Sequence, residues 1–215
     1  MAIDVVFLIK FGEKANIERL FTKGEIYMNT IQWFKNYEKK GIGDIYEGVT
    51  EIKNIVNGTL TLQIPNNPIV LNSASLQIRK HYTGHIGNIY STYAISNLLL
   101  QRKNLHHIDK RMEIFGSHCL IIKDVKAFTE AIFEKLKRMN YKYSHNIVKY
   151  KNFKKNNHEI TLFHKSHLLS YQKEHRILVW TDNAEPIKFE IGSLENYAEI
   201  YNSADVIKSL TVDLD

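Results

Sequence analysis

The segment IGNIYSTYAI, residues 86–95, carries β-branched and aromatic side chains along its length and predicts a strand at the centre of a sheet. Further strand-like segments lie on both sides of it in the chain, at residues 4–10 (DVVFLIK), 25–29 (EIYMN), 117–123 (SHCLIIK), 174–181 and 186–191. Predicted strands outnumber long helices, and the connections between most neighbouring strands are like those of β-hairpins. The sequence therefore predicts an α+β fold of mostly antiparallel sheets with a few short helices.

The helical patterns are short, with one exception. Residues 124–139 place apolar side chains at helical spacing behind Asp124, whose carboxylate can cap the first turn. Asn16 is predicted to cap a shorter helix that ends before Gly24. Thr30 is predicted to begin another, which runs to Lys39.

Turn signals divide the middle of the chain. Asn57-Gly58 predicts a tight hairpin between strands at residues 50–56 and 59–64, and Pro65 and Pro68 mark a further turn. A strand is expected at residues 159–163, and a short helix and a last strand in the tail from residue 197. Because no Pro-, Gly- or Ser-rich linker is apparent, residues 1–215 are predicted to form a single domain.

The composition is that of a globular protein. Of the 215 residues, 44% are hydrophobic and 24% charged, and the one cysteine, Cys119, excludes an intrachain disulfide. The formal net charge of +6 favours encounter with anions such as nucleotides, nucleic acid or acidic proteins. No secretory signal and no apolar run of membrane-spanning length is apparent, so we expect a reduced, cytoplasmic protein without a membrane partner.

Several familiar chemistries are not indicated. The chain has no G-x-G-x-x-G after a strand, no Walker A loop and no G-x-S-x-G elbow. His81 and His85 have Gly84 between them and are not expected on a helix, so no metal site is predicted. Cys119 lies in an apolar strand, where a buried structural thiol is expected rather than a nucleophile.

Three segments together indicate another chemistry. Lys10 ends the first strand, Ser91-Thr92-Tyr93 lies in the central strand, and Gln172 and Glu174 precede a late strand. This order resembles the ADP-ribosyltransferase superfamily, specifically its toxin class with an Arg, Ser-Thr-Ser and Gln-x-Glu signature. Lys10 stands where the family has arginine, and Tyr93 departs from the third member of the Ser-Thr-Ser motif. The resemblance covers these short segments and implies two antiparallel sheets that grip NAD.

The resemblance also implies roles for these residues, with NAD as substrate and no metal. Cleaving the bond between nicotinamide and ribose builds positive charge on the ribose, which the Glu174 carboxylate would stabilise. Gln172, two residues earlier on an extended strand, would point to the same side and orient the nucleophile. Ser91 would brace the carboxylate, and Lys10 or Arg176 would hold the pyrophosphate. The remaining NAD contacts are expected from Thr92 and from an aromatic ring that stacks on nicotinamide, namely Tyr90, Tyr93 or Tyr171.

Over most of its length the chain also resembles, more weakly, a group of bacterial and phage proteins of unknown function. The shared features are K-F-G-x-x-x-x-I at residues 10–17, G-x-I-Y-M-N-T at 24–30, G-D-x-x-E-G at 43–48 and Y-Q-x-E-x-R at 171–176.

Two further segments each have two interpretations. The loop GDIYEG holds Asp44 and Glu47 between glycines, and it either contacts ribose hydroxyls or is a polar turn, which is the commoner case. Residues 140–157 interleave lysines with aromatic rings, as single-stranded nucleic-acid sites do and as half-buried strands also do. The candidate nucleic-acid contacts in this stretch are Lys149, Tyr150, Lys151, Phe153, Lys154 and Lys155.

We therefore expect an NAD-dependent ADP-ribosyltransferase-like protein that modifies a protein or nucleic acid, in the setting of a toxin or phage-defence effector. The alternative is a non-catalytic module of phage or defence origin that binds a nucleotide or single-stranded nucleic acid. A third hypothesis, a structural or interaction protein, predicts no nucleotide binding. Glu174 discriminates between the first two, because catalysis needs it in a cleft that faces Ser91 and a cation. A binding module would instead depend on residues 149–155.

Overall fold

A computed structural model describes residues 5–37, 41–65, 67–84, 87–97, 107–182 and 184–210 of the protein, apart from the side chain of residue 73. The fold is α+β, with mostly antiparallel sheets and few short helices, as predicted. In chain order the elements are β1 (Val5–Gly12), α1 (Lys14–Lys23), β2 (Glu25–Thr30), α2 (Ile31–Asn36), β3 (Val49–Leu62), β4 (Ile69–His81), β5 (Asn88–Ser96), η1 (Lys110–Phe115), β6 (His118–Ile122), α4 (Val125–Arg138), β7 (Lys142–Ile147), β8 (Lys149–Lys151), β9 (His158–Glu159), β10 (His164–Ser166), η2 (His167–Gln172), β11 (Glu174–Trp180), β12 (Ile187–Glu190), β13 (Ala198–Asn202) and α5 (Ser203–Ser209).

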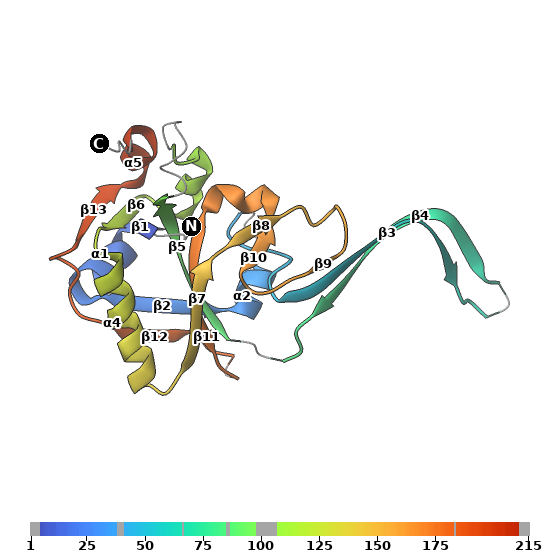
Figure 1. Cartoon of the computed structure of the whole chain (residues 1–215), viewed down its shortest axis with the longest axis horizontal. Helices are drawn as coiled ribbons and strands as arrows, with labels where there is room; N and C mark the ends of the chain where they lie inside the picture. Colours follow the sequence, from blue (N-terminus) through green and yellow to red (C-terminus); the bar gives the residue numbers. More distant parts are fainter. Residues whose placement is uncertain are drawn as a thin grey trace.

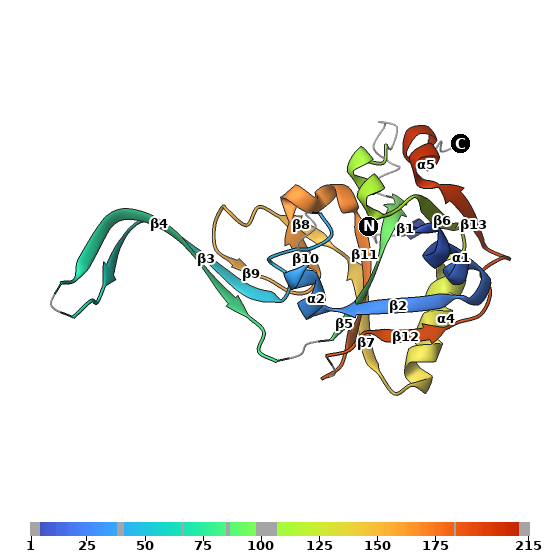
Figure 2. The same ribbon diagram turned by 180° about the vertical axis from the view of Figure 1, so that it is seen from behind.

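Strand β5 organises the main sheet, as its apolar sequence predicts. It pairs antiparallel with β11 along one edge, from Asn88 to Tyr93. Its other edge pairs with β2 at Asn88 and Ile89 and with β1 from Tyr93 to Ser96. Strands β6 and β13 continue the sheet beyond β1, β7 lies beyond β11, and β12 pairs with β2. Figure 2 shows β2 and β12 side by side, running across the direction of β5 and β11.

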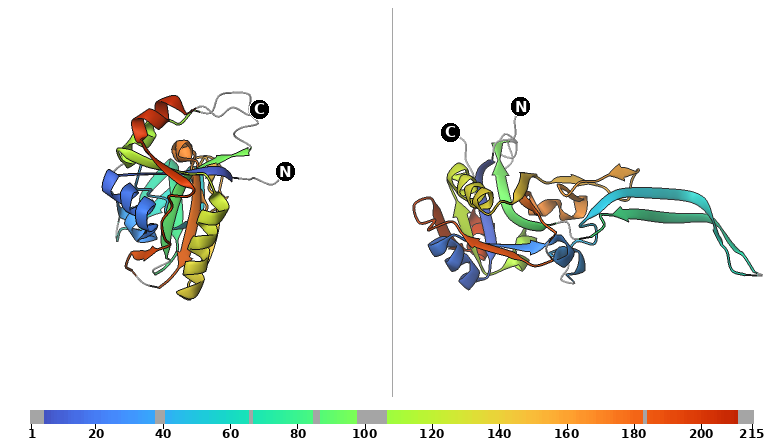
Figure 3. Two further views of the ribbon diagram at one scale, coloured as in Figure 1. Left: turned by 90° about the vertical axis from the view of Figure 1, so that its left-hand side faces the viewer. Right: turned by 90° about the horizontal axis from the view of Figure 1, so that it is seen from below.

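Both faces of this sheet are buried, and the side chains of β1 alternate between them. Leu8 packs in a cluster with residues of α1 and α4, whereas Ile9 and Phe11 pack in a second cluster with residues of η1 and α5. Successive side chains of a strand point to opposite faces, so one apolar strand serves two layers. Figures 1 and 3 show α4 along one side of the strands and α5 at the end of β13, which it follows.

The predicted helix starts are confirmed in two cases and wrong in one. The Asp124 carboxylate accepts a hydrogen bond from the Ala127 N–H at the start of α4, and the Thr30 hydroxyl caps α2. Asn16 is not a cap, because α1 begins two residues earlier and Asn16 instead accepts from Arg19. The predicted stop of α1 at Gly24 is confirmed by its left-handed φ of 64°. The predicted end of the second helix at residue 39 lies outside the described residues.

The predicted hairpin at Asn57-Gly58 is wrong. Strand β3 continues through both residues and pairs with β4 along its length. Asn57 has a φ of 57°, and the pairing register shifts on both sides of Gly58, so the dipeptide forms a bulge instead of a turn. The chain reverses between Leu62 and Ile69, where the two prolines predict a turn. Strands β3 and β4, residues 49–81, form a two-stranded ribbon that we call the arm; it projects from the body of the protein (Figures 1 and 3).

One strand prediction in the C-terminal half also differs from the structure. The strand expected at residues 159–163 is reduced to the short β9, followed by a turn into β10. The tail contains the two kinds of element expected there, the strand β13 followed by the short helix α5, and residues 211–215 lie outside the described part. Among the described helices, none combines the length and apolar character needed to cross a membrane.

Candidate functional site

A pocket opens where the main sheet splits. On the edge of β5 opposite β11, the pairing with β2 ends at Ile89 and the pairing with β1 begins at Tyr93. The residues between these two points, Tyr90, Ser91 and Thr92, therefore line a gap between β1 and β2. The pocket has a volume of about 570 Å³, and small-molecule sites occupy roughly 300–1,000 Å³.

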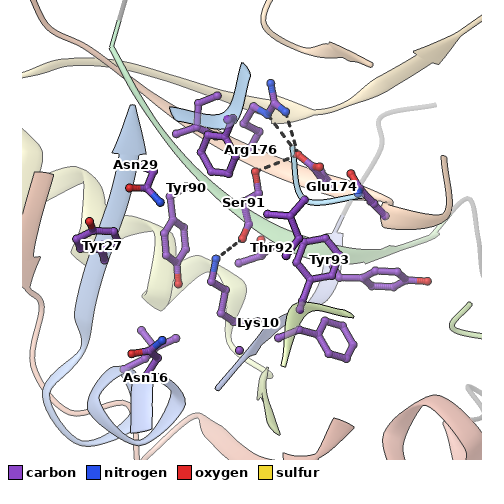
Figure 4. A pocket seen from close by; sticks show the side chains of 18 of the residues that line it. Lys10, Asn16, Tyr27, Asn29, Tyr90, Ser91, Thr92, Tyr93, Glu174 and Arg176 are labelled. Carbon is purple, nitrogen blue, oxygen red and sulfur yellow. Dashed lines mark hydrogen bonds and ion pairs between the residues drawn. The ribbon is translucent and has the colours of Figure 1, made fainter. Parts of the chain in front are cut away.

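Lys10 supplies a positive charge inside this pocket. Its Nζ donates a hydrogen bond of 2.7 Å to the backbone carbonyl of Ser91 and lies 4.2 Å from the centre of the Tyr90 ring. Figure 4 shows the side chain reaching from β1 toward β5. Burial lowers the pKa of Lys10 to about 8, and the negative charge of Glu174 acts in the opposite direction. The amine is therefore charged at neutral pH and loses its proton under mildly alkaline conditions.

Glu174 supplies the carboxylate of the pocket and is 7% exposed. The Ser91 hydroxyl donates to its Oε2 at 3.0 Å, Arg176 donates to the same oxygen at 3.1 Å, and Lys165 donates to Oε1 at 2.6 Å. Burial opposes ionisation, but Lys165 and Arg176 more than offset it and lower the pKa of Glu174 to about 2. Glu174 is therefore an anion across the physiological pH range.

The loop at residues 43–48 contributes a buried acid to this site. Its backbone is a polar turn, held by the Asp44 carboxylate, which accepts from the Tyr46 N–H at 2.9 Å. Glu47 is 4% exposed and lines the pocket. Its two oxygens accept from Nη1 and Nη2 of Arg176 at 2.8 Å and 3.1 Å, which is a bidentate pair.

The predicted role of Arg176 as a pyrophosphate ligand needs correction. Its side chain is 1% exposed, and its three nitrogens donate to Glu47, to Glu174 and to the carbonyl of Leu162. A guanidinium whose donors are engaged in this way positions carboxylates. Lys10 remains as the candidate cation for an anionic ligand.

Gln172 approaches Glu174 through a geometry different from the predicted one. It ends η2, and Lys173, with a left-handed φ of 40°, separates it from β11. The two side chains therefore do not project from one extended strand. They meet through Lys165, whose Nζ donates to the Gln172 Oε1 at 2.7 Å and to Glu174. The Gln172 amide also donates to the carbonyl of Gly41, so both ends of its side chain are held.

The two remaining residues of the central motif lie on β5 and line the pocket. Thr92 is buried, and its hydroxyl lies 3.5 Å from the backbone carbonyl of His175 on β11. Tyr93 is also buried, lines the pocket and packs edge-on against Phe11. Of the three rings expected near nicotinamide, Tyr90 and Tyr93 line the pocket (Figure 4).

Tyr171 does not share this position. It is buried in the cluster that contains η1 and α5 residues, outside the pocket lining, and the Arg111 guanidinium lies 3.9 Å from the centre of its ring. The expectation that Tyr171 stacks on nicotinamide is therefore wrong.

The lysine- and tyrosine-rich stretch folds into β7, β8 and a following turn. Phe153 is 1% exposed and packs with Val49, Ile52 and Ile160 at the base of the arm, so it cannot stack on a nucleic-acid base. The hydroxyl of Tyr150 accepts from the backbone N–H of Glu174 at 3.0 Å and fixes the start of β11. The lysines of this stretch remain candidates for anion contacts, with Lys149, Lys154 and Lys155 exposed and Lys151 half-buried.

Sequence reasoning missed Lys165, which is 4% exposed at the centre of the charge network. It lies on the short strand β10, which pairs with β8, and no local pattern distinguishes it from a surface lysine. The network joins two acids, Glu47 and Glu174, to two bases, Lys165 and Arg176, so its charges cancel. Lys10 then adds a positive charge to the pocket at neutral pH.

Sequence reasoning also missed the far wall of the pocket. This wall carries Tyr27 and Asn29 from β2, Asn16 from α1 and Trp33 from α2. The signal was present in β2, because strand alternation turns Tyr27 and Asn29 to the face opposite the apolar Ile26 and Met28, which are buried.

No protein-family model matches the chain, and searches of curated proteins and of solved structures give no significant match. Within the described ranges, no three His, Cys, Asp or Glu side chains gather closely enough to hold a metal ion.

Proposed function

We propose that the pocket binds NAD and that the protein transfers ADP-ribose from it to a macromolecule, as the resemblance to ADP-ribosyltransferases implies. One observation carries the proposal. Glu174, the carboxylate of the Gln-x-Glu motif, lies in a pocket, accepts a hydrogen bond from Ser91 and shares that pocket with the cation Lys10. Residues that are distant in sequence thus meet in one pocket, which supports the proposal.

The charge of each group suits cleavage of the bond between nicotinamide and ribose. As that C–N bond breaks, its electron pair leaves with nicotinamide and positive charge develops at C1′ of the ribose. The anionic Glu174 would stabilise this charge and accept a hydrogen bond from a ribose hydroxyl. Oε1 receives one hydrogen bond, from Lys165, and a carboxylate oxygen can accept two. A nucleophile of the target then forms a bond to C1′, and its proton passes to water.

The rest of the pocket suits a dinucleotide. Lys10 provides a cation for the pyrophosphate, although a lysine lacks the planar bidentate grip of the family's arginine. The rings of Tyr27 and Trp33 line the pocket, are 49% and 37% exposed, and offer stacking surfaces for the nicotinamide and adenine rings, whereas Tyr90 and Tyr93 form its buried wall. The asparagine side chains of Asn16 and Asn29 add polar groups for ribose or base.

A second candidate function rests on the same carboxylate. Both oxygens of Glu174 are already paired, with Lys165 and with Arg176, so its charge is largely compensated before any ligand enters. This favours a non-catalytic nucleotide-binding module, in which Glu174 organises the pocket and NAD stays intact.

The test measures binding and cleavage separately. NAD is titrated into the purified protein by calorimetry, and free nicotinamide and ADP-ribose adducts on lysate proteins and nucleic acid are followed by mass spectrometry. We expect binding, nicotinamide release and adducts for the wild type. Glu174→Gln should bind NAD but lose nicotinamide release, because the amide carries no charge.

The matched control is Glu190→Gln, the same substitution at an exposed position on β12 outside the pocket, which should leave nicotinamide release unchanged. Thermal melts of all three proteins separate a folding defect from a chemical one. Binding without nicotinamide release in the wild type would select the non-catalytic module. Absence of NAD binding would refute both candidates.

A further inference from the structure

Among its described residues, the arm is held to the body near its base. Strand β9 pairs with β3 at Glu51 and Ile52, and the Asn54 amide donates to the backbone carbonyl of Phe153 at 3.1 Å. On β4, the Gln77 amide donates to the same carbonyl at 2.9 Å. Beyond Asn54 and Gln77 the ribbon extends away from the rest of the protein, as Figures 1 and 2 and the right-hand view of Figure 3 show.

The free part of the arm is uncharged and rich in aliphatic residues. Between Lys53 and Arg79 the sequence contains no Asp, Glu, Lys, Arg or His, in a chain in which 24% of residues are charged. Large apolar side chains there are exposed to solvent by 41% to 71%, namely Ile55, Val56, Leu62, Ile64, Ile69, Val70, Leu71, Leu76 and Ile78. Monomeric proteins rarely expose a contiguous apolar patch of this kind, and such patches mark interaction sites.

The outer half of the arm is two-sided. Leu60 pairs with Leu71 and Leu62 with Ile69, and residues opposite one another in an antiparallel ladder share a face. These four residues form what we call the aliphatic face. The pair between them, Thr61 and Val70, points to the opposite face.

Two features show that the arm lacks a partner as it stands. A two-stranded ribbon is marginally stable in water and needs more strands or a packed face. Natural edge strands are protected by charges, especially lysine, or by proline or a covering element. Along the outer half of β3 and β4 there is no charge, and among the described residues no third strand pairs with it.

We propose that the arm is a self-association surface, in which the aliphatic face of one copy packs on the aliphatic face of a second copy. The charge distribution selects this occupant. Each chain has a net charge of +6, so two bodies repel, whereas the arms carry no charge between Lys53 and Arg79. An uncharged aliphatic surface is complementary to itself across a twofold axis, and a projecting arm lets two copies meet while their bodies stay apart.

The test is sedimentation velocity of the full chain from about 1 to about 100 µM, a range that covers the micromolar affinities of modest interfaces. We expect the wild type to pass from monomer to dimer. Leu71→Lys places a charge on the aliphatic face of each copy and should weaken association about 100-fold, a change that corresponds to about 2.7 kcal/mol.

The matched control is the neighbouring residue. Val70→Lys adds the same charge at a position of similar exposure, 52% against 46% for Leu71, but on the opposite face. It should dimerise as the wild type does. Circular dichroism checks that both variants keep their strands. A wild type that stays monomeric at the highest concentration, or two variants with equal association, would overturn the proposal, and the former would leave the arm to a different protein.

Discussion

Replacing Glu47 should destabilise the protein far more than its position in a glycine-rich loop would indicate. Glu47 is 4% exposed and its carboxylate forms the bidentate pair with Arg176, which is itself 1% exposed. In Glu47→Ala, Nη1 of Arg176 keeps only the carbonyl of Leu162, and Nη2 keeps only Glu174. A charge that is always present would then be buried with two of its five hydrogen bonds missing.

The size of the loss follows from that buried charge, which keeps Glu174 but loses Glu47. Removing one partner of a buried ion pair costs about 3–5 kcal/mol, because the remaining ion cannot return to water. For a chain of 215 residues, 1 kcal/mol corresponds to about 2–4 °C in melting temperature. Glu47→Ala should therefore lower the melting temperature by about 6–20 °C.

Urea unfolding and calorimetry measure this loss, with an exposed ion pair as control. Glu199→Ala removes the partner of Lys123 on the surface, where both side chains are about half exposed, and should leave the melting temperature close to that of the wild type. A double variant, Glu47→Ala with Arg176→Met, removes the buried charge as well and should recover part of the loss.

Two results would refute the reasoning. One is a Glu47→Ala protein as stable as the Glu199→Ala control. The other is a double variant no more stable than the single one, which would show that the guanidinium left without Glu47 is not the source of the loss.

Three smaller changes test other parts of the structure. Because burial lowers the pKa of Lys10 to about 8, NAD binding should weaken as the pH rises from about 7 to about 9 and the free protein loses this cation. Calorimetry should show a flat profile for Lys10→Arg, and an equally steep one would contradict this role of the lysine. Gly87 has a φ of +131° and a Cβ there would lie 2.0 Å from the carbonyl oxygen of Val179, so Gly87→Ala should cost about 2 kcal/mol or more in urea unfolding. Gly84→Ala, at a φ of +78° in open space, should cost less, and equal midpoints for the two variants would argue against the clash. Burial raises the pKa of the Cys119 thiol to about 12, so iodoacetamide at about pH 8 should modify it only after unfolding, as followed by mass spectrometry; rapid labelling of the folded protein would contradict its burial.

Local patterns predicted the elements whose structure depends on local physics. The helix α4 follows its apolar spacing and its Asp124 cap, and β5 is buried along nearly its whole length, as its sequence indicates. The same signals failed where a longer pairing competed with them. Asn57-Gly58 favours a tight turn, but β3 pairs on both sides of it with β4, and the dipeptide is used as a bulge.

The candidate site was also predicted in part, because short motifs identify residue types but not their surroundings in the fold. The order of Lys10, Ser91 and Glu174 along the chain was enough to nominate them together, and they line one pocket. The burial of Phe153 and the placement of Tyr171 away from the pocket were not readable, because an aromatic residue looks the same in sequence whether it lines a cleft or fills a core.

By itself, then, the sequence determined the strand-rich character of this protein, its longest helix and the residue types available for chemistry, because these depend on spacing within a few residues. Only the tertiary structure decided which of those residues meet. Ser91 and Glu174 are 83 positions apart, and Glu47 and Arg176 are 129 apart. Their contacts exist because β5 pairs with β11 and the 43–48 loop folds over that pair. Long-range strand pairing depends on the packing of the whole sheet, which no short segment encodes.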